Sequence, residues 1–262
     1  MKMTALVRKI LPGFPTDPLF VRLALSVLSI IFLVVSLAGL SLYHCKRQHE
    51  KQVIISTENL SQVLGGNIQH ILDRTDSVLL AVADEIQRQT VSGGVNEQAL
   101  NTFIARQKER LQFADSLRMA DEKGMVRYGT AVVPALKINI ADRDHFTRPR
   151  NNPNPLFFVS KPVVTRIDKK WALPVSRRLN KPDGSFAGVV YANIELKTFI
   201  DRFSSLSIGQ SGAVTMCDQE FKIIVRYPEP GGLGSTIGSK SATPQMLEMI
   251  QTGGESENPP RP

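Results

Sequence analysis

The chain has 262 residues, of which 42% are hydrophobic and 21% charged, and this balance excludes a wholly disordered or fibrous protein. Its two cysteines, Cys45 and Cys217, provide no disulfide framework, and four histidines without ligand spacing argue against a metal site. The net charge of +8 is concentrated between Lys137 and Lys181, where eleven basic residues accompany three acidic ones. Such a segment either attracts anions or forms a solvated basic rim, and the sequence leaves both interpretations open.

The first predicted element is an apolar helix over Leu23–Tyr43. These 21 residues carry no charge and include thirteen Leu, Ile, Val or Phe, and as a helix they would extend about 31 Å, the thickness of a bilayer core. The run is longer than the apolar core of a signal peptide, and no small-residue cleavage site follows it. We therefore predict one uncleaved transmembrane helix. Four basic residues precede it and three follow, which weakly favours residues 1–22 as a cytoplasmic tail.

A second helical pattern follows the apolar run. From Gln52 to Gln89 apolar residues recur mostly at steps of three and four, which predicts a long amphipathic helix rising from the membrane, with Gly65-Gly66 as a site for a kink. The same pattern suits a coiled-coil stalk that joins two copies of the chain. Ser92-Gly93-Gly94 should end this helix, and Asn96 should cap a further one over Glu97–Leu111.

After these helices the apolar period changes to that of strands. Residues 116–120 and 125–128 predict a hairpin, and Asp142–Arg148 predict a short helix ended by Pro149. A three-strand antiparallel meander, a short helix and another hairpin should follow, over residues 156–166, 171–179 and 185–196, then 197–206, then 213–217 and 221–225. This order predicts an α+β domain whose helices pack on an antiparallel sheet.

The last 36 residues, Tyr227–Pro262, have a different composition. They contain six Gly and six Pro, with one candidate helix over Pro244–Gln251. We expect a flexible linker there.

Four segments in the predicted domain resemble one family of sensors. Asn139–Phe146 resembles the "dRdyF" segment of extracytoplasmic PDC/Cache domains, and Pro182–Val190 resembles their "pDGsfaGvv" turn. Phe158–Val163 and Val175–Leu179 resemble the intervening strands. The likeness is collinear over about residues 45–230, and it is closest to the membrane-distal half of double-Cache sensors attached to diguanylate cyclases and histidine kinases.

The resemblance implies a domain organisation and a location. It implies a sensor domain over residues 44–226, on the periplasmic side of a bacterial inner membrane, and the start of a second Cache lobe in residues 227–262. A receptor of this type would continue into a second span and an output domain, so we interpret the chain as a truncated signalling protein. It contains no GGDEF motif, kinase histidine box or nucleophile elbow, and Ser239 stands where a phosphate loop needs Gly, so we predict no enzyme activity and no cofactor.

The resemblance also implies a ligand site. In amino-acid-binding members of the family, an Arg followed by Trp and Tyr holds the ligand carboxylate, and a later Asp holds the ammonium group. Arg143 matches the Arg, His145 and Phe146 replace the aromatic pair, and Asn193 replaces the Asp. A guanidinium can still bind a carboxylate through two parallel hydrogen bonds, whereas Asn193 offers no charge to an ammonium group. The departures therefore imply a small carboxylate-like anion rather than an α-amino acid.

Secondary candidates on the meander are Lys161, Arg166 and Arg178, with Trp171 as a pocket wall. Strand Lys and Arg usually lie on a solvated face, and a lone Trp usually lies in a core. Expected partners are a small anion, the membrane and a second copy through the N-terminal helix, but not nucleic acid, since aromatics are sparse in the basic segment. Two alternatives remain: a ligandless dimerisation or protein-interaction module, and an inactive fragment of a diguanylate cyclase or histidine kinase.

Overall fold

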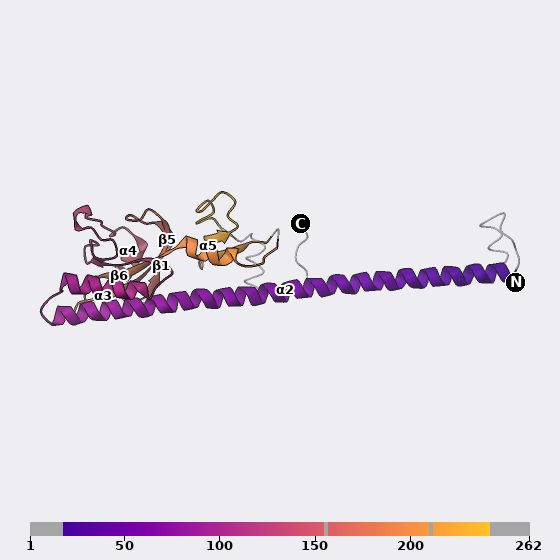
Figure 1. Cartoon of the computed structure of the whole chain (residues 1–262), viewed down its shortest axis with the longest axis horizontal. Helices are drawn as coiled ribbons and strands as arrows, with labels where there is room; N and C mark the ends of the chain where they lie inside the picture. The colour runs from indigo at the N-terminus through magenta and orange to yellow at the C-terminus, as the bar shows by residue number, and fades with distance from the viewer. Residues whose placement is uncertain (1–17, 155–156, 210–211, 242–262) are drawn as a thin grey trace. The chain divides into compact units, whose positions relative to one another are not determined.

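A computed structural model describes residues 18–154, 157–209 and 212–241 of the chain. The chain divides into two compact units, residues 1–67 and residues 68–262. Their secondary structure is one very long helix, shared by both units, followed in the second unit by short helices and strands (Figure 1). The predicted α+β class with a long N-terminal helix and an antiparallel sheet is confirmed.

The first unit contains, among its described residues, only the beginning of helix α2, Pro18–Val91. This helix includes a segment that is long and apolar enough to cross a membrane, by length and composition alone. The sequence predicted two helices, over residues 23–43 and 52–89, but the structure joins them into one. The linking residues 44–51 are polar and contain neither Gly nor Pro, so nothing in them interrupts the backbone hydrogen bonds.

Helix α2 ends where the glycines were predicted to end it. Val91 is its last residue, and Gly93 and Gly94 both have positive φ angles, at 114° and 126°. Helix α3, Glu97–Glu109, then begins at the predicted cap, with the side chain of Asn96 accepting a hydrogen bond of 2.9 Å from the backbone N–H of Ala99.

The main sheet has six antiparallel strands in the order β2-β1-β6-β5-β3, with β4 also paired to β5. The predicted first hairpin and the three-strand meander are both confirmed. The bounds of the strands are β1 Ala114–Asp121, β2 Val126–Gly129, β3 Phe157–Val159, β4 Val163–Val164, β5 Trp171–Asn180 and β6 Phe186–Glu195.

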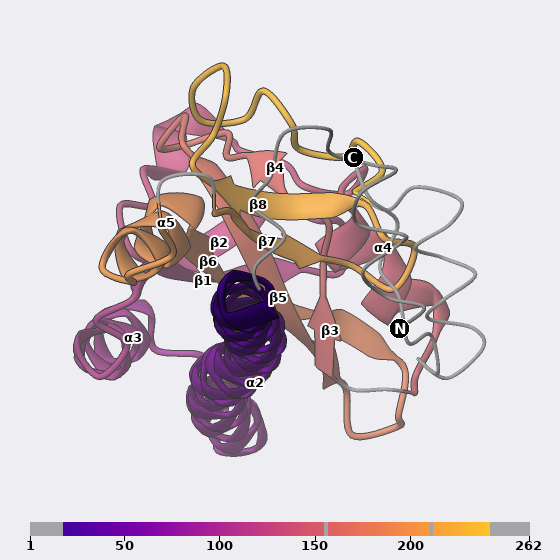
Figure 2. The ribbon, with the colours of Figure 1, turned by 90° about the vertical axis from the view of Figure 1, so that its right-hand side faces the viewer.

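The two faces of the sheet are covered by different elements. Helix α3 packs on β1 and β2, and the last turns of α2 bury an apolar stripe that includes Leu79 and Val82. Helix α4, Asp144–Asn151, packs on β5 and β6 from the opposite side, as Figures 1 and 2 show. Because strand side chains alternate between faces, each strand contributes every second residue to the α4 side.

Two predicted elements differ from the observed ones near prolines. The strand predicted over residues 156–166 is interrupted between β3 and β4, where Pro162 has no N–H to donate to the ladder. The helix predicted over residues 142–148 instead extends through Pro149 to Asn151. Its last turn is closed by a 3.0 Å hydrogen bond from the N–H of Asn152 to the carbonyl of Arg148, so the missing proline N–H does not end it.

The rest of the described chain forms a small second layer. Helix α5, Leu196–Ser204, packs against strand β8, Ile223–Tyr227, which pairs with β7, Val214–Cys217. In the following loop, the carboxylate of Glu229 accepts three hydrogen bonds of 2.7–2.8 Å from Ser235 and Thr236. The helix predicted over residues 244–251 lies outside the described residues.

Candidate functional site

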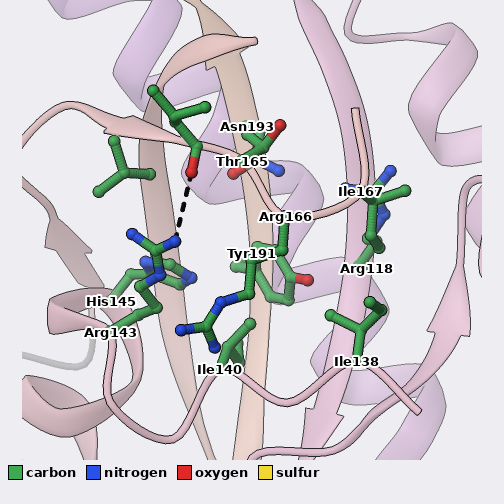
Figure 3. Close-up of a pocket in the computed structure, with 12 residues that line it drawn as sticks. Arg118, Ile138, Ile140, Arg143, His145, Thr165, Arg166, Ile167, Tyr191 and Asn193 are labelled. Carbon is green, nitrogen blue, oxygen red and sulfur yellow. Dashed lines mark hydrogen bonds between the residues drawn. The ribbon is translucent and has the colours of Figure 1, made fainter. Parts of the chain in front are cut away.

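A small cavity lies on the α4 side of the sheet, with a volume of about 20 Å³. Its wall is formed by the segment before α4, the turn between β4 and β5, and the middle of β1 and β6 (Figure 3). Twelve residues line it: Arg118, Ile138, Ile140, Arg143, His145, Val163, Val164, Thr165, Arg166, Ile167, Tyr191 and Asn193. The volume is small beside the ~300–1,000 Å³ of typical ligand pockets.

The floor of the cavity is set by the register of two central strands. Arg118 lies directly opposite Tyr191, and Ser116 directly opposite Asn193. Alternate positions on each strand therefore place these four polar side chains on one face. The Nδ2 of Asn193 donates to the Oγ of Ser116 over 3.0 Å, which fixes the orientation of this amide.

Arg118 is a buried cation whose charge is already neutralised. Its Nη2 donates to both carboxylate oxygens of Asp168, at 2.9 and 3.2 Å, and its Nε donates to the carbonyl of Thr130 at 2.8 Å. The neighbouring Tyr191 is also buried, and burial raises the pKa of its phenol to about 12. Tyr191 is therefore a neutral hydroxyl at any physiological pH.

Arg143 differs from Arg118 in having no carboxylate partner in the described part of the chain. Its extended backbone occupies the N-cap position of α4, and its Nη2 donates only to the carbonyl of Val164, at 3.3 Å, as the dashed line in Figure 3 marks. Within residues 18–154, 157–209 and 212–241 it forms no ion pair. Its guanidinium retains donors and a full positive charge for another anionic group.

His145 also lines the cavity, and one of its ring nitrogens is unsatisfied. Its side chain is 4% exposed, and its Nδ1 has no hydrogen-bond partner among the described residues. Burial, reinforced by the positive charge of Arg143, lowers the pKa of His145 to about 3, so the imidazole is neutral. Buried polar atoms are nearly always hydrogen-bonded in folded proteins, so this nitrogen suits a bound group.

The lining favours an anion on electrostatic grounds. Three of the described lining residues are arginines, and none is Asp or Glu. Figure 3 shows Arg143 and His145 together on one side of the cavity and Arg118 on the other, with Tyr191 and the side chain of Arg166 between them. An ammonium group placed here would meet no carboxylate in the lining, whereas a carboxylate would meet Arg143.

Four of the eight residues predicted as ligand contacts come together here, namely Arg143, His145, Arg166 and Asn193. The other four lie elsewhere. Phe146 is fully buried in a core cluster and contacts Phe186 edge-on. The side chain of Lys161 is half exposed and lies 4.0 Å from Glu220, and the indole of Trp171 lies against the backbone of Gly234. Arg178 donates to the carbonyls of Pro149 and Arg150.

The sequence reasoning missed the residues that β1 and the β4–β5 turn bring to the cavity, chiefly Arg118 and Thr165. A signal for Arg118 exists in the sequence. Ser116 and Arg118 alternate with Leu117 and Met119, which indicates a strand with one polar and one apolar face.

A larger groove of about 660 Å³ lies on the opposite face, between the end of α2 and one end of the sheet. Its arginines Arg127 and Arg177 pair with Asp121 and Asp76 at 2.7 and 2.9 Å, and Lys181 pairs with a glutamate. Arg178 also lines the groove, and its guanidinium donates to two backbone carbonyls and to Asn180. Arg143 makes a single side-chain hydrogen bond among the described residues, so we place the candidate site in the smaller cavity. Among the described residues, no group of three His, Cys, Asp or Glu is arranged to hold a metal ion.

Comparison with known proteins agrees with this architecture. The family model dCache_1, which describes a Cache domain, matches residues 45–257. Among curated protein sequences, none matches the chain.

Solved structures share the fold at low sequence identity. The extracellular domain of rpHK1S-Z16, named as a histidine kinase, is 23% identical, with 74% of each chain covered and a TM-score of 0.60. The ligand-binding domain of the Campylobacter jejuni chemoreceptor Tlp3, in complex with 4-methylisoleucine, is 15% identical over 68% of this chain and 72% of that one, with a TM-score of 0.53. That of the Pseudomonas fluorescens chemoreceptor CtaA, in complex with L-alanine, is 17% identical over 70% and 73%, also with a TM-score of 0.53.

Proposed function

This chain belongs to the Cache-domain family of ligand-binding sensors, and on that premise we propose that it binds a small carboxylate-like anion at Arg143. Cache domains of this type are non-catalytic modules that bind ligands for signalling proteins. The observation that carries the proposal is the guanidinium of Arg143, which has no carboxylate partner among the described residues and lines the cavity together with His145, whose Nδ1 is unsatisfied. A bidentate pair with a ligand carboxylate would use donors that the fold leaves available.

The choice of an anion over an amino acid rests on the surrounding charges. The chemoreceptor domains named above are in complex with amino acids, and a free carboxylate would favour the ammonium group of such a ligand. Here Asn193 is neutral and bonded to Ser116, and the nearby carboxylate of Asp168 is paired with Arg118. These contacts support a ligand without an ammonium group, such as a short mono- or dicarboxylate.

Calorimetric titration of the full chain in lipid nanodiscs tests this proposal. Acetate, pyruvate and succinate are compared with L-alanine and γ-aminobutyrate. We expect at least one carboxylate without an amino group to bind, and Arg143→Gln to lose that binding. Arg148→Gln is the matched control, because this substitution removes the same charge from an exposed position on the same helix. Binding of L-alanine alone, or equal binding by Arg143→Gln, would refute the assignment.

We further propose that the apolar segment of α2 anchors the domain in a bacterial inner membrane with the domain outside the cytoplasm. The support is its length and composition, together with membership in a family of extracellular sensors. In intact spheroplasts, a membrane-impermeant maleimide should label Cys217 in a Cys45→Ser variant, but not a cysteine introduced at Thr4. The reverse labelling pattern would place the domain inside.

We also propose that two copies of the chain form a homodimer through the N-terminal helix, in the part of α2 that follows the apolar segment. Four large apolar side chains in this part of α2 are more than half exposed: Val53, Ile54, Ile55 and Val63. Exposed apolar residues beyond a membrane segment favour helix pairing. Mass measurement in nanodiscs should detect dimers, which replacement of all four residues by Ser should reduce. A monomeric wild-type chain would favour signalling without dimerisation.

The alternative of a ligandless interaction module differs in one respect. It requires a filled, apolar pocket, whereas the lining here is rich in arginine. Failure of every compound in the titration would favour this alternative.

A further inference from the structure

Arg166 lines the cavity, and its guanidinium is already paired with a carboxylate of the protein in the way that it would pair with a ligand carboxylate. Its Nη1 and Nη2 donate to the two carboxylate oxygens of Asp142, at 2.8 and 2.7 Å. Two parallel bonds of this length are the geometry with which arginine binds a planar carboxylate. Arg166 lines the cavity, but Asp142 does not. An internal carboxylate thus holds one of the three cavity arginines from outside.

The pair also connects two parts of the cavity wall. Arg166 belongs to the turn between β4 and β5, and Asp142 immediately precedes Arg143 at the start of α4. Arg166 additionally donates to the carbonyl of Asn139 in the same segment. The side chain of Arg166 therefore lies between the two sides of the cavity, as Figure 3 shows, and the cavity has a volume of about 20 Å³.

The exposure of the pair makes it easy to rearrange. The side chain of Asp142 is 62% exposed and that of Arg166 is 35% exposed. Ion pairs in contact with water contribute little to stability, because solvent compensates each partner when the pair opens. The other pair at the cavity contrasts with this one: the side chain of Arg118 is 2% exposed, so its charge depends on Asp168 for compensation.

Building on the proposed function, we propose that Asp142 competes with the ligand for Arg166 and so sets the affinity of the site. In the closed arrangement Asp142 holds Arg166 across the cavity. A ligand carboxylate bound at Arg143 takes over the guanidinium of Arg166, the cavity widens, and the carboxylate of Asp142 turns to solvent. The ligand class that can make this exchange is a small planar carboxylate, and a dicarboxylate could engage Arg143 and Arg166 with separate ends.

The test compares two variants that remove the same charge from neighbouring positions. Three proteins in nanodiscs are titrated with acetate and with succinate: the wild-type chain, Asp142→Asn and Asp144→Asn. Asp144 lies in the first turn of α4 and forms no ion pair within the described residues. If Asp142 competes for Arg166, its removal should tighten carboxylate binding by about three- to tenfold, given the typical strength of exposed pairs and the loss of one repelling charge. Asp144→Asn should change the dissociation constant less than about twofold.

The outcomes separate this inference from the proposal on which it rests. Suppose that the wild type binds a carboxylate. If Asp142→Asn then binds it with equal or lower affinity, or if Asp144→Asn tightens binding as much as Asp142→Asn does, the competition is overturned and the anion site stands. Absence of carboxylate binding by all three proteins overturns both. Asp142→Ser provides a second variant with the same expectation, and an unfolding temperature close to that of the wild type verifies that each variant is folded.

Discussion

The buried pair between Arg118 and Asp168 should make the domain sensitive to one conservative change. Replacing Asp168 by Asn removes the charge but keeps the size, and it leaves Arg118 charged at 2% side-chain exposure. Breaking a buried pair by removing one partner costs about 3–5 kcal/mol. Because Asp168 itself is 19% exposed, and the Nε of Arg118 keeps its bond to Thr130, we expect the lower end, about 3 kcal/mol.

This loss can be followed with the protein's own fluorophore. Trp171 is the single tryptophan of the chain and begins strand β5, so its emission reports unfolding of the sensor domain. For a domain of this size, about 3 kcal/mol corresponds to a fall of roughly 6–12 °C in the unfolding temperature. The measurement uses the full chain in nanodiscs.

A matched control and a double variant make the reasoning refutable. Asp115→Asn removes the same charge from an exposed pair with Lys170, which is 49% exposed, and should cost less than about 1 kcal/mol. Replacing both members of the buried pair, as Arg118→Met with Asp168→Leu, should recover much of the lost stability. Equal shifts for Asp168→Asn and Asp115→Asn would show that Arg118 is not held as a buried charge.

Three further expectations follow from the structure. Burial lowers the pKa of His145 from 6.5 to about 3, so between these pH values the unfolded chain binds a proton that the folded chain does not. As the pH falls from 6.5 to 5, the free energy of unfolding of the wild type should therefore decrease by about 2 kcal/mol. Denaturant titrations of His145→Gln should lack this pH dependence. A Cβ at Gly188 would overlap the carbonyl oxygen of Ala120, so Gly188→Ala should lower the unfolding temperature more than Gly184→Ala, where open space leaves only about 1–2 kcal/mol of backbone strain. Phe146 is fully buried in the core, so Phe146→Ala should cost about 3–5 kcal/mol in the same assay.

The elements could be predicted where their signals are local. Asn96 and Gly93 stand next to the helix ends that they define, and the apolar period changes at the residues where strands begin. Errors arose where a local signal was overridden by a contact. Pro149 indicates a helix end, but the turn that contains it is closed by a backbone bond from Asn152 and packs on the sheet, so the helix continues.

The site could be predicted only in part, because its other half depends on strand register. Arg143 and His145 lie in one short motif, so resemblance alone brought them together. Arg118 reaches the same cavity because β1 pairs with β6 so that it faces Tyr191, and a shift of one residue would turn it to the other face. A single sequence contains no record of that pairing.

The basic segment shows why local charge is a poor guide to an anion site. Five acidic residues from outside residues 137–181 pair with cations inside it: Asp76, Asp115, Glu122, Glu195 and Glu220. Asp142, within the segment, pairs with Arg166. The fold thus pairs five of the segment's eleven basic residues with carboxylates, so its net charge alone does not locate an anion site. What distinguishes Arg143 is its place: its guanidinium has no carboxylate partner among the described residues, and it lines a cavity together with His145, whose Nδ1 is unsatisfied.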